Sequence, residues 1–318
     1  MANLYLNTPT CSEAGFGNTG VPSCFFDPKN VVGAIIVPKT LGFTAAQILT
    51  FKTTLQTATT VVGINSRIFP VFRFVGVTDN SEDVTLQTSG YGEKQIAKEG
   101  DYDWTFQYFK GGACYNANLR RFNTGEWAML FVDSDNMIFG TKHSDGKFYG
   151  VTTSFSYAPK WKLNDGSNVT AYGLRVSLPK PEELNDRGKL AYVACDFDVE
   201  TEIKGLIDLE LSEVETAFGI ATVKIKTLCG KTDMADDYST EFADATLWTV
   251  TKDSDGSTVV ISGVTYDSGN KAWDVAFTGT GSHTIGLASP TTLSAAGIGG
   301  SPENSYEGID LQVTMPTS

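Results

Sequence analysis

Two glycine-rich stretches carry the residue types that hold phosphate groups in nucleotide-binding proteins. Residues 15–20 (GFGNTG) match the spacing G-x-G-x-x-G, which needs a preceding strand and a following helix to bind a pyrophosphate. No strand pattern precedes them and Pro22 follows them, so we interpret them as part of a flexible arm. Residues 230–232 (GKT) end like a phosphate-binding loop, but Ile225 stands where the first glycine is required. We therefore expect no nucleotide site.

Acidic turns and histidines are the other candidates for metal or acid–base chemistry. Residues 133–136 (DSDN) and 253–256 (DSDG) open like a calcium loop, but neither supplies the later glycine and glutamate. His143 and His283 lie beside serines, outside any hydrolase or zinc pattern; surface or turn positions are expected. A carboxylate pair for glycoside hydrolysis stays open among the 37 acidic residues. We predict that the chain is not an enzyme and has no catalytic, cofactor-binding or metal-binding residue.

An aromatic stripe is the remaining candidate for ligand binding. Tyr102, Trp104, Phe106 and Tyr108 alternate with polar residues, so all four point to one face of a strand. An exposed stripe of this kind would bind carbohydrate. Packing in a core is the favoured interpretation, because burial of aromatic rings stabilises sheets.

The charge balance narrows the class of partner. The chain has 318 residues, is 41% hydrophobic and 19% charged, and carries a net charge of −13. A nucleic-acid-binding surface needs clustered Lys and Arg, and an anionic membrane would also repel this chain. No apolar run approaches the length that spans a bilayer. An acidic wall beside DNA suits a conduit, because it keeps the polyanion from binding.

The cysteines and the first residues bear on the compartment. Five cysteines are odd in number, widely spaced and never form C-x-x-C (Cys11, Cys24, Cys114, Cys195 and Cys229). We expect reduced thiols in a protein assembled in the cytoplasm. Residues 1–10 lack the basic and apolar regions of a secretory signal, so the glycosylation pattern at residues 168–170 is interpreted as chance.

Strands dominate the predicted structure of the first 220 residues. Residues 1–30 lack periodicity and indicate an N-terminal arm, and 31–37 an apolar buried strand. The Thr44–Gln47 capping box and the helical spacing after it predict a helix over 44–58. Alternation of apolar and polar residues then predicts strands of antiparallel sheet at 102–108, 151–157, 172–178 and 191–199. Short helices are expected at 116–122, 181–186 and 211–218.

A change of composition near residue 220 predicts a domain boundary. Residues 221–318 contain no Arg, and six short strands alternate there with turn sequences (222–226, 247–252, 258–266, 271–277, 283–287 and 309–315). Strands of this length and spacing indicate a β-sandwich, with Trp248 or Trp273 as its core tryptophan. The predicted fold class is therefore mainly β, with one larger domain at 1–220 and a sandwich at 221–318.

Two regions of the chain resemble bacteriophage virion proteins. Residues 69–140 resemble tail tube (major tail) proteins in the strand at 69–75, the segments VTLQT (84–88) and YGEKQ (91–95), the strand at 102–109, NLRRF (118–122) and the strand at 127–133. The C-terminal part is similar to the immunoglobulin-like domains appended to phage tail and capsid proteins, in GVTYD (263–267), KAW (271–273) and GLASP (286–290).

The resemblance implies a virion protein of the tail, assembled in the host cytoplasm. Six subunits would join their sheets into one closed ring, and the rings would stack into a tube. The expected partners are further copies of the chain, other tail proteins, and genomic DNA that passes through without specific binding. The N-terminal arm and a hairpin around 90–100 would contact the next ring, and residues 221–318 would decorate the outside. Two alternatives stay open: a head fibre, decoration or receptor-binding protein that binds glycans or the host surface, and a carbohydrate-active enzyme.

Overall fold

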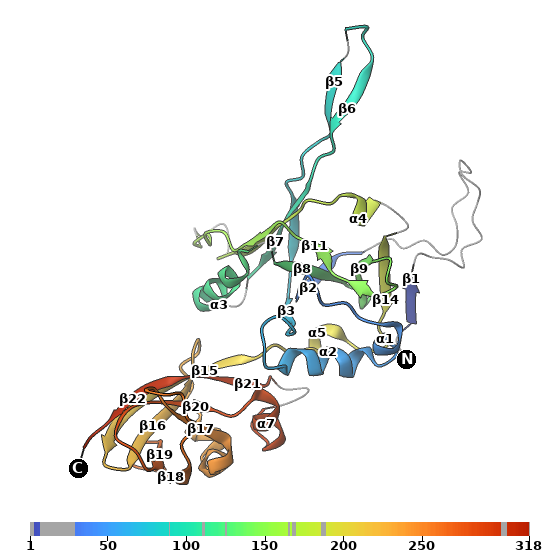
Figure 1. Cartoon of the computed structure of the whole chain (residues 1–318). Helices are drawn as coiled ribbons and strands as arrows, with labels where there is room; N and C mark the ends of the chain where they lie inside the picture. The colour runs from blue at the N-terminus through green and yellow to red at the C-terminus, as the bar shows by residue number, and fades with distance from the viewer. Residues whose placement is uncertain are drawn as a thin grey trace. The chain divides into compact units, whose positions relative to one another are not determined.

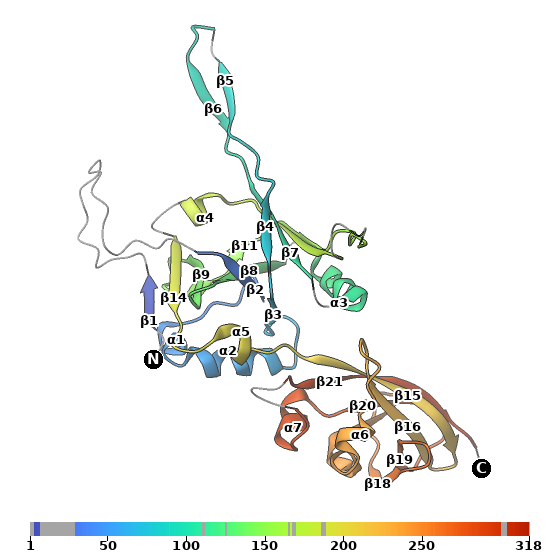
Figure 2. The same ribbon diagram turned by 180° about the vertical axis from the view of Figure 1, so that it is seen from behind.

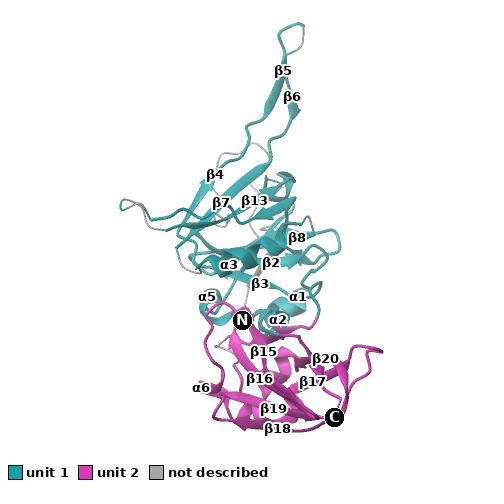
Figure 3. Ribbon diagram, turned by 90° about the vertical axis from the view of Figure 1, so that its left-hand side faces the viewer, with its two compact units in different colours: residues 1–59, 63–203 teal, residues 60–62, 204–318 magenta. Residues whose placement is uncertain are grey.

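The chain folds as a mainly β protein, as predicted, with two compact units (Figure 3). The computed structural model describes residues 3–6, 29–88, 90–109, 112–124, 126–164, 166, 170–185, 189–299 and 304–317. Unit 1 comprises residues 1–59 and 63–203, and unit 2 comprises residues 60–62 and 204–318. Each unit has hydrophobic core residues of its own.

The larger sheet of unit 1, sheet A, is buried on both of its faces. It has eight strands, six of them in the order β1 (Asn3–Leu6), β14 (Leu190–Ala194), β9 (Met137–Lys142), β8 (Trp127–Asp133), β2 (Val31–Pro38) and β3 (Phe69–Phe72), with β10 (Phe148–Tyr149) on β9 and β11 (Val151–Thr152) on β8. Ile35 and Val37 of β2 face one core cluster, whereas Ala34 and Ile36 face another. Successive side chains point to opposite faces, and both faces are covered, so the residues on both sides are apolar and β2 is a continuous apolar run.

Helices cover one face of sheet A (Figures 1 and 2). Helices α1 (Ala45–Leu49) and α2 (Phe51–Thr60) place Ile48, Phe51 and Leu55 against that face. The predicted helix start is confirmed, because Thr44 and Gln47 form a reciprocal capping box. Unit 1 has three further described helices and a 3-10 turn: α3 (Gly112–Leu119), η1 (Arg120–Phe122), α4 (Glu182–Asn185) and α5 (Val199–Glu202).

Sheet B packs against the other face of sheet A. Its four strands run in the order β12 (Phe155–Tyr157), β13 (Tyr172–Leu178), β7 (Tyr102–Tyr108) and β4 (Gly76–Asp79). The aromatic stripe of β7 lies in the shared core with the apolar residues of β13, so the packing interpretation is confirmed. Beyond β4 and β7 the chain forms a separate two-stranded hairpin, β5 (Thr85–Thr88) and β6 (Lys94–Lys98), which projects from the rest of unit 1 (Figure 1).

Two predicted strands of unit 1 differ from the structure. The alternating segment 151–157 is divided, since β11 pairs in sheet A and β12 pairs in sheet B. The segment 191–199 stops being a strand at Ala194, and Asp198 then caps helix α5 through its side chain. An alternating pattern shows which side chains share a face, but it does not show where a strand changes sheets.

Unit 2 consists of two sheets that enclose a core. The five-stranded sheet has the order β18 (Ile261–Asp267), β19 (Ala272–Phe277), β16 (Ile220–Thr227), β15 (Ile207–Ala217) and β21 (Tyr306–Ile309), and the three-stranded sheet has the order β17 (Trp248–Lys252), β20 (Gly281–Leu287) and β22 (Leu311–Met315). Short helical segments connect them: α6 (Ala235–Tyr238), η2 (Glu241–Ala243), η3 (Ala245–Leu247) and α7 (Pro290–Ala295). Trp248 and Trp273 both lie in the core, and their indole N–H groups donate to Phe242 O and Ser239 O.

The unit begins earlier than the composition indicates. Residues 211–218 were expected to be helical, but residues 211–217 belong to β15 and residue 218 to the turn that follows, so that expectation is wrong. Strand β15 pairs with β16 from Leu209 to Ala217, and Leu209 and Leu211 enter the core. Unit 2 therefore starts at Lys204, 17 residues before the expected boundary at 221.

Candidate assembly surface

Sheet B is the open part of unit 1. Sheet A has a core cluster on each face, whereas among the described residues sheet B has a core on one face only. Its two edge strands, β4 and β12, each pair with one described strand and leave the other side open. A sheet with one free face and two open edges can be extended by another chain.

Strand β4 is the more exposed of the two edges. All four of its residues are exposed, and Val77, which lies opposite buried Phe106, is 55% exposed. It contains no Lys, no Pro and no bulge, the features that commonly prevent edge strands from pairing. The one charged residue of β4 is Asp79 at its end, so positions 76–78 carry no feature that blocks the approach of a further strand.

The segment before β4 connects the edges of both sheets. The chain leaves β3 at the edge of sheet A, and the Phe74 and Val75 N–H groups donate to Val32 O and Gln107 O. Arg73 directly follows β3 and has a φ of 69°, an uncommon value for a residue with a side chain. Its guanidinium pairs with Glu200 at 3.3 Å. A single segment thus forms the same side of the sandwich in both sheets.

Strand β12 forms the opposite edge of sheet B. Phe155 and Tyr157 lie opposite Ser177 and Arg175 of β13, and Tyr157 remains partly exposed. Pro159 follows closely in the sequence and lies outside the strand, so it leaves the edge itself available. The two edges of sheet B are therefore different surfaces on opposite sides of one sheet.

The hairpin β5–β6 has no core of its own. Every residue of both strands is exposed. Leu86 lies opposite Ile96, and Tyr91 near the tip is 99% exposed. An isolated two-stranded hairpin is marginally stable in water, so these apolar side chains need a covering surface that the described part of the chain does not provide.

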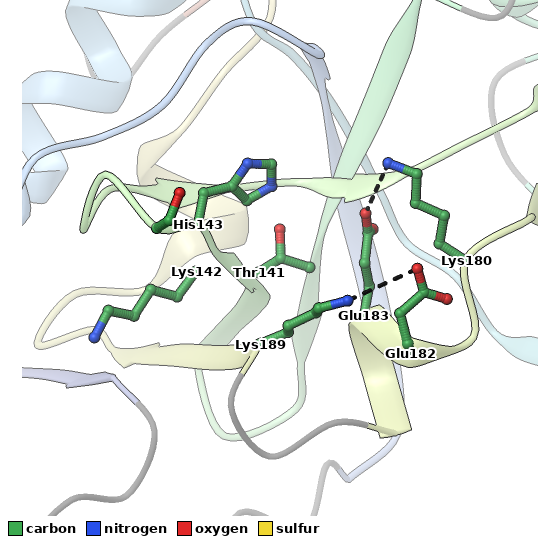
Figure 4. Close-up of a pocket in the computed structure, with 8 residues that line it drawn as sticks. Thr141, Lys142, His143, Lys180, Glu182, Glu183 and Lys189 are labelled. Atoms are coloured by element: carbon green, nitrogen blue, oxygen red, sulfur yellow. Dashed lines mark ion pairs between the residues drawn. The ribbon is translucent and has the colours of Figure 1, made fainter.

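A pocket of about 600 Å³ on unit 1 was not predicted from the sequence (Figure 4). Lys180 and Lys189 pair there with Glu183 and Glu182 at 3.4 and 3.8 Å. The carboxylate of Glu183 is buried and accepts bonds of 2.7 Å from both the N–H and the hydroxyl of Thr152. Its polar groups thus hold α4 against β11, and we assign the pocket a structural role.

The two acidic turns are occupied by their own hydrogen bonds. In the first, Asp133 accepts from the N–H groups of Asp135 and Met137 at 2.9 and 3.0 Å. In the second, Asp253 accepts from the side chains of Ser282, Thr284 and Gln312. These bonds lower the pKa of Asp253 to about 2. The described residues contain no cluster of His, Cys, Asp and Glu able to hold a metal ion.

His143, His283 and the GKT sequence each have contacts of their own that leave no motif for catalysis or phosphate binding. His143 lies beside Tyr149, with ring centroids 4.3 Å apart. His283 is buried against Phe277 in unit 2, so the expectation of a surface or turn position is wrong for it. Lys231, in the GKT sequence, forms an ion pair with Glu210 instead of lining a loop for phosphate. The GFGNTG sequence at 15–20 lies outside the described residues, and so do residues 168 and 169 of the glycosylation pattern.

The cysteines differ from the prediction of reduced thiols. Cys114 is in a disulfide, and so is Cys229, whereas Cys195 is the free thiol of the described residues. Burial raises the pKa of the Cys195 thiol to about 12, so it is not a nucleophile at neutral pH. Cys11 and Cys24 lie outside the described residues. Sequence spacing could not reveal the disulfides, because pairing depends on distances in the fold.

Two sequence comparisons were made, with protein-family models and with curated proteins. No protein-family model matches the chain, and a search of curated proteins finds no significant match. Among the described residues, no helix is long and apolar enough to cross a membrane. The geometry of sheet B and its hairpin therefore carries the functional argument.

Proposed function

We propose that the chain is a non-enzymatic virion protein, a subunit of a bacteriophage tail tube that forms stacked rings around a DNA conduit. The observation that carries the proposal is sheet B, which among the described residues has one uncovered face and two edge strands, β4 and β12, that each pair with a single strand. The resemblance of residues 69–140 to tail tube proteins points to the same function.

Ring formation follows from the two different edges. Pairing of β4 of one copy with β12 of the next is a head-to-tail contact, which repeats until the ring closes. A closed ring leaves no exposed sheet edge. The resemblance gives six copies as the number in the ring.

Stacking of rings would use the hairpin β5–β6. Burial of Leu86, Ile96 and Tyr91 against the next ring would remove their apolar surface from water. Residues 3–6, expected within an N-terminal arm, instead form β1 at the edge of sheet A, and residues 7–28 lie outside the described residues. Unit 2, a two-sheet sandwich that we assign to the immunoglobulin-like class, would decorate the outside of the tube. Other tail proteins would bind at the two ends of the tube, and assembly would take place in the host cytoplasm.

Electron microscopy of the purified full-length protein tests the proposal. We expect hollow tubes, and we expect Val77→Lys to prevent their formation because it places a charge on the open edge. Val77 is already exposed, so the variant should fold. The matched control is Val260→Lys, the same change at an exposed position of unit 2, which should leave the tubes intact.

Protein that stays monomeric at high concentration would overturn the proposal. Discrete trimers or monomers that bind glycans or cells would favour the fibre, decoration or receptor-binding alternative. Tubes that form equally well from Val77→Lys would show that sheet B edges do not join the copies.

A further inference from the structure

The free face of sheet B carries only two charged side chains in its strands. The register places ten residues of β12, β13, β7 and β4 on this face: Phe155, Tyr157, Gly173, Arg175, Ser177, Asp103, Thr105, Gln107, Gly76 and Thr78. Asp103 and Arg175 are the charged members of this set, and they neutralise each other. For a chain with a net charge of −13, the absence of excess negative charge on these strand positions needs an explanation.

Asp103 uses two of the groups through which Arg175 could bind a phosphate. The Arg175 Nε donates to both carboxylate oxygens of Asp103 at 2.9 and 3.1 Å, and its Nη2 donates to one of them at 2.6 Å. This bidentate arrangement is the one that a guanidinium also makes with a phosphate. The Arg175 side chain is 46% exposed, so its position is accessible from solvent.

The amide donors of the same face are also directed at their neighbours. Asn80, which follows β4, donates to the Thr105 hydroxyl at 2.9 Å. Gln107 donates to the Thr78 hydroxyl at 3.3 Å. The polar side chains of β4 and β7 therefore bond along the face and not away from it.

In a ring closed through sheet B, this face would line the lumen. The other face of sheet B is covered by sheet A and its helices, and that bulk has to lie on the outside of the ring. Every subunit would then present one Asp103–Arg175 pair to the passing DNA.

We propose that Asp103 is a positioning residue that prevents the free face of sheet B from binding the phosphates of duplex DNA, because it occupies the guanidinium of Arg175. This inference rests on the proposed function for the identity of the polyanion. Without Asp103, each ring would present unpaired guanidinium groups to the DNA. Multiple guanidinium–phosphate contacts would slow the DNA, since each contact adds to affinity in a salt-dependent way. Local pairing of charges, not only a repulsive acidic wall, would keep the conduit free of binding.

The test compares DNA binding of full-length variants that all carry Val77→Lys. This substitution is expected to keep the copies dissociated, so the free face is open to solvent even if the unmodified chain forms tubes. Fluorescence anisotropy of a short labelled DNA duplex is measured with the parent, Asp103→Ala, Asp103→Ala/Arg175→Gln, and Asp237→Ala. Asp237 is an exposed residue of α6, so its removal makes the same change in net charge elsewhere. We expect Asp103→Ala to bind the duplex about tenfold more tightly than the parent, with affinity falling as salt rises.

The double variant and Asp237→Ala should bind as weakly as the parent. Equal binding by Asp103→Ala and Asp237→Ala would overturn the inference, and so would tight binding by the parent. Circular dichroism confirms the fold of each variant, and Asp103→Asn replaces Asp103→Ala if the latter does not fold. Tube formation by the unmodified chain is scored separately, so failure of the proposed function and failure of this inference give different results.

Discussion

The hairpins β5–β6 and β15–β16 show how the same pattern serves two purposes. Both pair antiparallel strands, and in both an apolar residue of one strand lies opposite an apolar residue of the other, Leu211 opposite Ile225 and Leu86 opposite Ile96. In β15–β16, Leu209, Leu211, Val223 and Ile225 are buried beneath the second sheet of unit 2. In β5–β6, Leu86 and Ile96 are exposed and face no other layer of the described chain.

The difference shows that an apolar pair across two strands does not by itself specify what covers it. In unit 2 the covering layer is supplied by the same chain, and the sandwich is complete. In unit 1 the hairpin and the β4 edge have no such layer, which agrees with a cover supplied by another copy. The predictions below separate these two cases by stability, by solvent exchange and by pH.

The largest effect should come from removing β15 from unit 2. Fragment 204–318 should fold, whereas fragment 221–318 should not, because it lacks a strand that pairs along all of β16 and two core leucines. Far-UV circular dichroism and thermal unfolding of both fragments measure this. A cooperative transition of fragment 221–318 would restore the boundary expected from composition and show that β15 is dispensable.

Matched leucine substitutions in the two hairpins should differ strongly. Leu211→Ala removes a side chain that is 6% exposed and should cost about 2–4 kcal/mol of the free energy of unfolding of unit 2. Leu86→Ala, at a position 52% exposed, should change the stability of the dissociated chain by less than about 0.5 kcal/mol. Urea unfolding measures both. Similar losses at the two sites would mean that Leu86 is covered within its own chain.

Part of the fold could be predicted because several of its strands, such as β7 and β13, alternate between apolar and polar residues. The faces of β7 and β13 and the start of α1 follow directly from residue types at periods of two and 3.6. The failures lie where long-range contacts decide the outcome. Residues 211–218 read as a short helix until their partner β16 is considered, and His283 reads as a turn residue until Phe277 packs on it.

The candidate site was predictable only in part. The resemblance implied a hairpin around 90–100, but the sequence did not show which strands would be edges, since strand order depends on pairings between distant segments. The Asp103–Arg175 pair joins residues 72 positions apart, so no local motif could reveal it. A charged residue at an outward position of each of two strands was the only signal.

Amide exchange should give a smaller but distinct contrast between the hairpins. In the dissociated chain the amides of β5–β6 should exchange rapidly, because their hydrogen bonds are exposed to solvent, whereas those of β15–β16 should be protected by the core. In assembled tubes we expect new protection in β5–β6 and little change in β15–β16. Hydrogen–deuterium exchange with mass spectrometry measures both states. Unchanged exchange of β5–β6 in tubes would exclude the hairpin from the contact between rings.

The smallest effect concerns two carboxylates, one in each region. Hydrogen bonds from Ser282, Gln312 and Thr284 lower the pKa of Asp253 from 3.8 to about 2, and Ser81 lowers the pKa of Asp79 near the base of the hairpin. A carboxyl group with a lowered pKa in the folded state stabilises that state above its unfolded pKa, and this stability is lost as the pH falls through the folded pKa.

The melting temperature of unit 2 should therefore fall between about pH 4 and pH 2, and Asp253→Asn should weaken this dependence. Because the Asp253 bonds join β20 and β22 whereas the Asp79 bonds are local, Asp79→Asn should leave the melting of both units nearly unchanged. Thermal unfolding of the three proteins across this pH range is the measurement, and an unaltered pH dependence in Asp253→Asn would show that other carboxylates set the acid stability of the sandwich.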